Sequence, residues 1–348
     1  MSDSFPNEPR NHGAALEVSA PEAVPERRAG SPLWVHLVLF LATCVTTTFW
    51  GALYAGTGWA DWWKGLAYSG PLMAILLTHE MGHYIAARRH RIAVSLPYFI
   101  PFPFGLGTLG AVISMKDRIE SRNALVDVGA SGPLAGFIVA VVVLAVGLSQ
   151  SSVGPIPPGS GMASEGNSIL YFAMKRVITG RWLPMGGWDV FLTPTALAGW
   201  IGFLVTMINL IPVGQLDGGH VAFAYFGDGY ERFCRILHRS LPLVAVLVMA
   251  YVTYDNLHQV APTDPLLLEP AWRLWPLVTW KDAAMSGFFA GFPWLLWPAL
   301  LSGLKKMGEG RYHPPVGDEP LSKGRRMVAL VVGLLFVLIF TPVPMVGL

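Results

Sequence analysis

Two histidines and a glutamate stand close together in the segment THEMGH at positions 78–83. Residues four positions apart share one face of a helix, so His79 and His83 can bind one metal ion while Glu80 lies beside it. Zinc held by three protein ligands keeps a fourth position for water, lowers the pKa of that water and polarises a carbonyl group. Glu80 would take the proton of the water and deliver it to a leaving amine. The spacing therefore predicts metal-assisted hydrolysis of an amide bond.

Such a site needs a third ligand, and the strongest candidate is Asp217 in the segment NLIPVGQLDGGH at positions 209–220. Pro212 and Gly214 are expected to break the helix there, and broken backbone at membrane depth is tolerated where it lines a cavity. His220 is expected near the metal but not on it, because three ligands and a water complete tetrahedral zinc. We expect one Zn²⁺ per chain, bound by His79, His83 and Asp217.

These residues belong to a chain of 348 residues that is 53% hydrophobic and only 13% charged, with a mean hydropathy of +0.48. Charge is too sparse to cover a water-soluble globule of this size. Stretches of roughly 20 apolar residues, long enough to cross a bilayer, occur near 33–54, 66–87, 122–148, 194–214, 238–254, 284–304 and 326–347. We therefore predict an all-α polytopic membrane protein with about seven transmembrane helices, of which three form the catalytic core.

The positions of the charged residues predict the orientation in the membrane. Most of the 24 Lys and Arg fall between the predicted spans on the side that holds the N-terminus, which places that side in the cytoplasm. The protein is thus expected to be a multi-pass protein of the cell (inner) membrane. A net charge of +2 leaves no basic excess for binding nucleic acid.

The chain is expected to form one membrane domain, residues 32–348, with its core at 66–225. Residues 1–31 are rich in Pro, Glu, Ala and Arg and poor in large apolar side chains, so they predict a disordered cytoplasmic tail and not a cleaved signal peptide.

The segment 94–115 carries Phe, Pro and Gly directly after the metal-binding segment. It predicts either a re-entrant hairpin whose strand edge holds an unwound peptide, or a plain interfacial anchor.

Both chemical motifs resemble those of the site-2 proteases, whose hallmarks are HExxH in one span and NxxPxxxLDG in a later one. The two patterns are complete here, at 79–83 and 209–218, and the likeness extends to 97–103, 109–113 and 129–136. The sequence looks like the branch without a PDZ domain that includes chloroplast proteases and their bacterial and archaeal relatives. This resemblance covers residues 66–225.

The resemblance implies that His79, His83 and Asp217 bind zinc and that Glu80 is the catalytic base. Asn209 matches the Asn of the family motif and is expected to donate a hydrogen bond to the oxyanion or to the substrate backbone. A bond between two helices is an equally good interpretation of Asn209. Gly132 and Pro133 are expected to serve close packing of their helix against the metal helix.

The family resemblance also implies a substrate that is itself a transmembrane helix, cut within the lipid bilayer during regulated intramembrane proteolysis. Nothing in the sequence specifies an oligomeric state. Two other hypotheses stay open: a membrane zinc peptidase of another class, and a metal or proton transporter that uses the His/Glu cluster as a relay.

The remaining histidines with no partner at a ligand spacing are expected to be ordinary loop or span-end residues: His36, His90, His238, His258 and His313.

Overall fold

The structure is a computed structural model that describes residues 31–57, 59–156, 163–185, 187–258, 279–307, 310–314, 316–317 and 319–347. The tail predicted at 1–31 lies outside the described residues except for Ser31. Residues Pro32–Leu348 form one compact unit. Within it the chain is mostly helical, as the sequence predicted.

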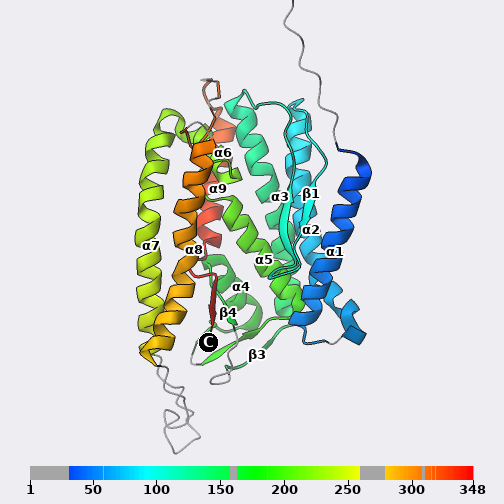
Figure 1. Ribbon diagram of the computed structural model, residues 1–348, viewed down its shortest axis with the longest axis vertical. Coiled ribbons are helices and arrows are strands. Elements are labelled where there is room, and N and C mark those ends of the chain that lie inside the picture. Colours follow the sequence, from blue (N-terminus) through cyan, green and yellow to red (C-terminus); the bar gives the residue numbers. More distant parts are fainter. Residues whose placement is uncertain are drawn as a thin grey trace, which may run out of the picture. The chain divides into compact units, whose positions relative to one another are not determined.

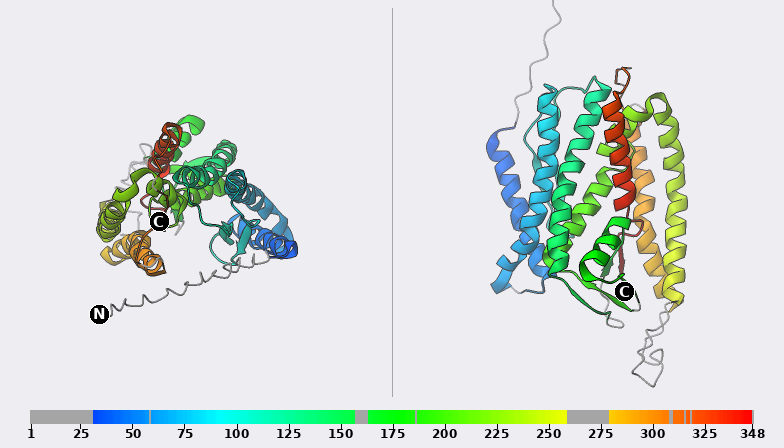
Figure 2. Two further views of the ribbon diagram at one scale, coloured as in Figure 1. Left: turned by 90° about the horizontal axis from the view of Figure 1, so that it is seen from above. Right: turned by 180° about the vertical axis from the view of Figure 1, so that it is seen from behind.

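The long helices of this unit run back and forth between two opposite ends (Figures 1 and 2). Because α2 and α5 run in the same direction, the end of α2 and the short helix α6 lie at the same end of the unit. The long helices are α1 (Leu33–Tyr54), α2 (Leu66–Arg89), α3 (Arg122–Ser149), α5 (Pro194–Asn209), α7 (Tyr230–His258), α8 (Trp280–Met307) and α9 (Lys323–Ile339). The shorter ones are η1 (Trp59–Gly65), α4 (Ile169–Thr179), α6 (Asp217–Phe226) and η2 (Gly227–Gly229).

Four stretches of the described residues are long and apolar enough to cross a membrane: Leu33–Tyr54, Arg122–Ser149, Asp217–Leu257 and Trp280–Gly303. The third of these runs through α6, η2 and α7. Helix α5 is apolar but shorter. The chain is therefore a membrane protein.

Local sequence signals explain where the helices of the site begin and end. The hydroxyl of Ser121 accepts a hydrogen bond of 3.3 Å from the backbone of Ala124 and caps α3. Thr193 caps α5 in the same way, and Pro194 takes the first helical position, where its missing N–H costs nothing. Helix α5 ends at Asn209, before the segment that Pro212 and Gly214 were expected to break.

Small residues let α2, α3 and α5 approach one another closely. A Cβ added to Gly199 of α5 would lie 2.6 Å from the Cα of Leu144 on α3, and one added to Gly202 would lie 2.8 Å from the Cδ1 of Ile75 on α2. Helices in membranes gain most of their mutual attraction from such close contact, because lipid tails are as apolar as the side chains. These three helices form the frame that holds the candidate site.

The expectation of an all-α fold is wrong in one respect, because the chain also forms small two-stranded sheets. Strands β1 (Tyr98–Pro101) and β2 (Thr108–Val112) make an antiparallel hairpin with Tyr98 opposite Val112. At the end of the unit opposite to α6, β3 (Ser152–Pro155) pairs with β5 (Trp188–Phe191), and β4 (Ala163–Glu165) pairs with β6 (Met345–Gly347). The last pair joins segments far apart in the sequence.

The hairpin lies along α1 and α2 (Figure 1). Its turn approaches α1 so closely that a Cβ on Gly107, whose φ is 79°, would lie 2.6 Å from the Cα of Thr47. The hydroxyl of Thr46 donates to the Gly107 carbonyl at 2.6 Å, and that of Tyr68 donates to the Leu106 carbonyl at 2.9 Å. Two helices thus fix the position of this hairpin.

Candidate metal centre

The structure brings His79, His83 and Asp217 together. The Nε2 atoms of the two histidines are 3.1 Å apart, and Oδ2 of Asp217 lies 3.2 Å from Nε2 of His79 and 3.1 Å from Nε2 of His83. Donor atoms placed ~2.0–2.1 Å from a tetrahedral zinc ion lie about 3.3 Å from one another. The triangle formed by these atoms therefore has the size that a single small divalent cation requires.

The hydrogen bond on the far side of His83 fixes which nitrogen faces the triangle. Its Nδ1 lies 2.7 Å from the carbonyl oxygen of Val128 on α3. A carbonyl only accepts, so Nδ1 carries a hydrogen, and Nε2 is the nitrogen that faces Asp217. Two imidazole nitrogens and a carboxylate oxygen at this separation are held together by a shared cation or by protons between them. The donor set fits a bound metal.

Burial strengthens this interpretation. His79 is 4% exposed and His83 is 6% exposed, although both lie on a helix with an otherwise largely apolar buried face. Imidazole and carboxylate groups are costly to bury unless they are paired or bind a metal.

Glu80 is buried beside the triangle but is not one of its corners. Its carboxylate accepts a hydrogen bond from the backbone N–H of Ile113, the residue that follows β2. The hairpin therefore reaches the site and holds the Glu80 carboxylate in place.

Asn209, the last residue of α5, also reaches the site. Its amide nitrogen lies 3.3 Å from Nε2 of His79. This position suits either of the roles expected for Asn209, since the side chain both touches the metal-binding residues and joins α5 to α2.

Glycines on α3 make room for the metal-binding side chains, as expected for Gly132. A Cβ on Gly132 would collide with the imidazole of His83, and one on Gly136 would lie 3.0 Å from the Cβ of His79. On the facing helix, a Cβ on Gly82 would lie 2.5 Å from the carbonyl oxygen of Ser131. The ligands on α2 can occupy this place only because α3 offers no side chain there.

We expect Gly132→Ala to lower zinc affinity roughly 10- to 100-fold, the range found when groups that orient metal ligands are changed. The added methyl group displaces the His83 imidazole from the triangle. Gly333→Ala on α9 is the matched control, because a Cβ at Gly333 meets open space. Zinc titration of both purified variants measures the effect, and equal affinities would show that the α2–α3 contact does not position His83.

The structure also shows a pair of histidines that the sequence does not predict. Nδ1 of His220 on α6 lies 2.7 Å from Nε2 of His313, and the His313 ring stacks on Phe223 with centroids 4.2 Å apart. Burial lowers the pKa of His313, which favours the neutral ring. The expectation that His313 is an ordinary loop residue is therefore wrong, and only a contact between α6 and the segment after α8 reveals its partner.

Three other histidines also have specific partners. His36 donates from Nδ1 to the carbonyl of Pro97 at 3.1 Å and so joins α1 to the segment before β1. His90 contacts Asp127 at 2.8 Å, and Nδ1 of His238 lies 2.8 Å from the Tyr312 hydroxyl. The side chain of His258 lies outside the described residues.

Comparison with known proteins identifies similar sequences. The model of the family described as Peptidase family M50 matches residues 67–250. A probable zinc metalloprotease EGY2, chloroplastic, from Oryza sativa subsp. indica is 36% identical over 160 residues, which cover 44% of this chain and 28% of the relative. A probable zinc metalloprotease EGY1, chloroplastic, from Oryza sativa subsp. japonica is 35% identical over 224 residues, or 62% of this chain and 37% of the relative.

The corresponding EGY1 protein of Arabidopsis thaliana is 36% identical over 166 residues, covering 47% of this chain and 29% of the relative. The chain thus spans about a third of the length of the curated relatives that it matches. No solved structure matches it.

Proposed function

This chain belongs to peptidase family M50, and from that premise we propose that it is a zinc-dependent intramembrane endopeptidase. The observation that carries the proposal is the triangle of His79, His83 and Asp217, with Glu80 buried beside it. The names of the relatives, which call them probable zinc metalloproteases, support zinc as the metal.

His79, His83 and Asp217 would hold the ion. Zinc bound in this way supplies Lewis-acid polarisation of a carbonyl group and a water molecule of lowered pKa. Glu80 acts as general base and then as general acid, because its carboxylate lies next to the triangle without being one of its corners and can move a proton from water to the leaving amine. The bond from Ile113 orients that carboxylate, and the amide of Asn209 offers a hydrogen-bond donor for the developing oxyanion.

The substrate is proposed to be a transmembrane helix of another membrane protein, cut in regulated intramembrane proteolysis. Support comes from the burial of His79, Glu80 and His83 among the helices of a membrane protein. Peptide bonds within a helix are protected, so the substrate must unwind locally before cleavage. The hairpin β1–β2, which reaches Glu80, offers a strand edge for the unwound segment.

The membrane arrangement is proposed as seven spans with a cytoplasmic N-terminus in the inner membrane and with β1–β2 as a re-entrant hairpin. The alternation of α1, α2, α3, α5, α7, α8 and α9 between two ends supports this count, and exposed Phe102, Phe104 and Leu109 suit a hairpin within lipid.

In a bacterial inner membrane, we expect Arg118→Cys to react with an impermeant thiol reagent only after lysis and Arg181→Cys to react in intact cells. The reverse labelling would invert the orientation.

Neither alternative function has an observation in its favour. Family membership and the completeness of the triangle argue for hydrolysis rather than for a metal or proton relay. A membrane zinc peptidase of another class would take a Glu or His as its third ligand, whereas Asp217 occupies that corner here.

The proposed function is tested with the purified chain in liposomes that contain a model transmembrane peptide. Cleavage within the apolar segment is expected, should disappear after dialysis against a zinc chelator and should return when zinc is restored. Cleavage that persists without metal, or that occurs only in the soluble flanks of the peptide, would count against an intramembrane zinc protease.

A further inference from the structure

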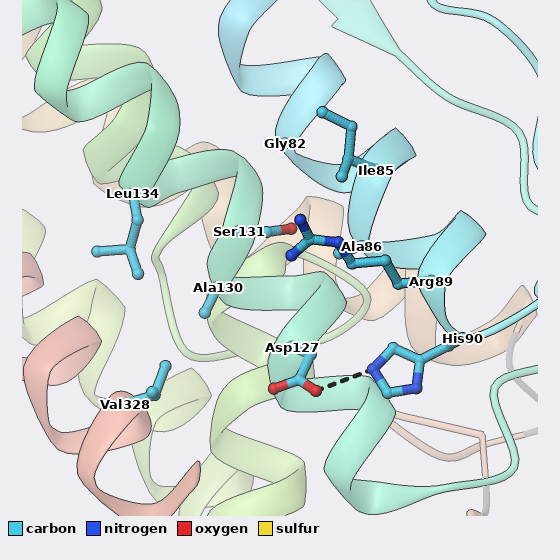
Figure 3. A pocket seen from close by; sticks show the side chains of 10 residues that line it. All are labelled: Gly82, Ile85, Ala86, Arg89, His90, Asp127, Ala130, Ser131, Leu134 and Val328. Atoms are coloured by element: carbon cyan, nitrogen blue, oxygen red, sulfur yellow. Dashed lines mark hydrogen bonds and ion pairs between the residues drawn. The ribbon is translucent and has the colours of Figure 1, made fainter. Parts of the chain in front are cut away.

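A cavity of about 490 Å³ lies between α2, α3 and α9 (Figure 3). Its volume falls within the range of cavities that hold small-molecule ligands, roughly 300–1,000 Å³. It is lined by Gly82, Ile85, Ala86, Arg89, His90, Asp127, Ala130, Ser131, Leu134 and Val328. We propose that it binds an anionic phospholipid, with the phosphate on Arg89 and an acyl chain along Ile85, Leu134 and Val328.

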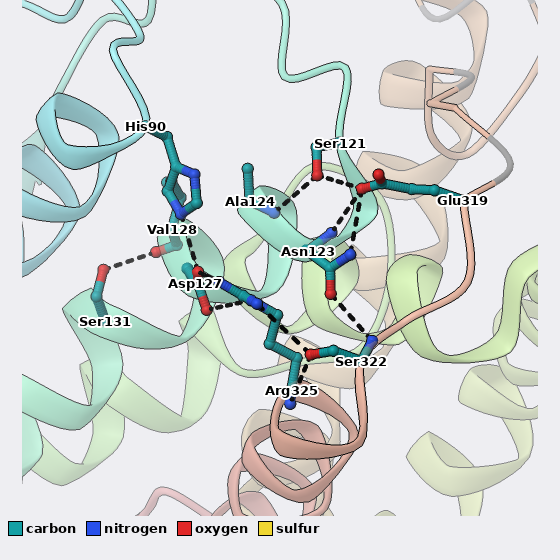
Figure 4. Close-up of polar contacts among 10 residues, drawn as sticks. All are labelled: His90, Ser121, Asn123, Ala124, Asp127, Val128, Ser131, Glu319, Ser322 and Arg325. Atoms are coloured by element: carbon teal, nitrogen blue, oxygen red, sulfur yellow. Dashed lines mark hydrogen bonds and ion pairs between the residues drawn. The ribbon is translucent and has the colours of Figure 1, made fainter.

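The charges around the cavity leave one cation without a partner. Asp127 accepts from Arg325 at 2.6 Å and contacts His90 at 2.8 Å, so its charge is already balanced (Figure 4). The guanidinium of Arg89 points across the cavity toward α3 (Figure 3), and no residue in the described part of the chain pairs with it. A guanidinium group binds a phosphate through two parallel hydrogen bonds, which makes a phosphate ester a well-matched partner.

The surroundings of the cavity identify the anion as part of a lipid. Ile85 is 47% exposed at the cavity itself. One helical turn further along the same faces, Ile138 of α3 is 64% exposed and Val331 of α9 is 47% exposed. Apolar side chains that lie open on the outside of membrane helices face acyl chains. Arg89 is the last residue of α2. A cationic side chain at the end of a membrane helix lies at the depth of the lipid phosphates.

A lipid in this cavity would contact the same helix junction that positions the metal ligands. Gly82 and Ser131 both line the cavity, and α2 and α3 are in close contact there, since a Cβ on Gly82 would lie 2.5 Å from the carbonyl oxygen of Ser131. Their sequence neighbours His83 and Gly132 face each other on the metal side. Binding would therefore stabilise the α2–α3–α9 junction by mass action. The inference rests on the membrane location and not on the proposed proteolysis.

The test measures lipid binding to the purified full chain in neutral detergent by native mass spectrometry. Phosphatidylglycerol and phosphatidylcholine with identical acyl chains are titrated, and inorganic phosphate is added as a competitor. We expect phosphatidylglycerol to bind roughly five- to tenfold more tightly than phosphatidylcholine, the effect of one cation beside an anionic headgroup. Arg89→Gln should abolish that difference, and Leu134→Trp, which fills the cavity, should weaken both lipids.

Arg88→Gln is the matched control, since Arg88 is an exposed neighbour that does not line the cavity. Equal losses in the Arg88 and Arg89 variants, equal affinity of the wild type for both lipids, or unchanged binding in the Leu134 variant would each overturn the proposal. Displacement of phosphatidylglycerol by millimolar phosphate would assign the site to a soluble anion instead. Zinc content and the melting temperature of each variant verify that it is folded.

Discussion

Replacing Asp217 by Ala is expected to remove most of the bound zinc and all measurable cleavage. The Asp217 carboxylate provides one corner of the triangle, at 3.1–3.2 Å from both imidazole nitrogens, and it is the only anionic corner. Changes to groups that only orient ligands already cost 10- to 100-fold in affinity, so the loss of a ligand should cost at least that much. Zinc content after identical purification and cleavage of a transmembrane peptide measure the two effects.

Asp228→Ala is the matched control for this experiment. Asp228 is exposed on η2, two residues beyond the end of α6, and takes no part in the triangle. Its replacement should leave zinc content and cleavage near wild type. Asp217→Glu, one methylene longer, should keep part of the metal but lose most activity, because the ion moves relative to Glu80. If Asp217→Ala matches Asp228→Ala in both measurements, Asp217 is not a ligand and His220 becomes the next candidate.

Glu80→Gln is expected to keep its zinc and to slow cleavage roughly 10²- to 10⁴-fold, the contribution of a positioned general acid–base. Gln has the shape of Glu and can still accept from the backbone of Ile113, but it cannot take a proton from water. Single-turnover cleavage in liposomes and zinc content are measured on the same preparation. Accumulation of an uncut membrane protein in cells that carry this variant would then identify the natural substrate.

Glu120→Gln serves as the control, because Glu120 is exposed in the segment before α3 and changes charge in the same way. Three results would contradict the assigned role. Normal cleavage by Glu80→Gln would remove Glu80 from the chemistry. Loss of zinc would make it a structural residue of the metal site. If the wild type cleaves no substrate but carries an ion flux that Glu80→Gln abolishes, the transporter hypothesis is favoured.

The sequence predicts the parts of the site that depend on local spacing. The i, i+4 relation places both imidazoles on one face of α2, and the direction of α2 and α5 places Asp217 at the same end of the unit. Apolar runs likewise predict the positions of the long helices. Helix α2 packs against α1, α3 and α5, but its His, Glu and Arg residues keep it outside the apolar stretches Leu33–Tyr54, Arg122–Ser149, Asp217–Leu257 and Trp280–Gly303.

The features that the sequence does not predict are those that depend on contacts between distant segments. The pairing of β4 with β6 places Glu165 opposite Met345. Neither short strand has an alternating pattern of apolar and polar residues that would predict the pairing. The His220–His313 bond joins α6 to the segment after α8. The network around Asp127 likewise depends on the docking of α9 against α3, which brings Arg325 to it (Figure 4). No local propensity carries information about such pairs.

X-ray absorption at the zinc edge tests most directly whether His79, His83 and Asp217 hold one zinc ion. The purified chain loaded with one equivalent of zinc should show a first shell of nitrogen and oxygen at ~2.0–2.1 Å, with the outer-shell scattering of two imidazole rings. That imidazole signal should fall by half in His79→Ala. A sulfur shell at ~2.3 Å would assign the metal to Cys44 or Cys234. That result, or a wild-type spectrum without imidazole scattering, would show that these three residues do not hold the zinc ion.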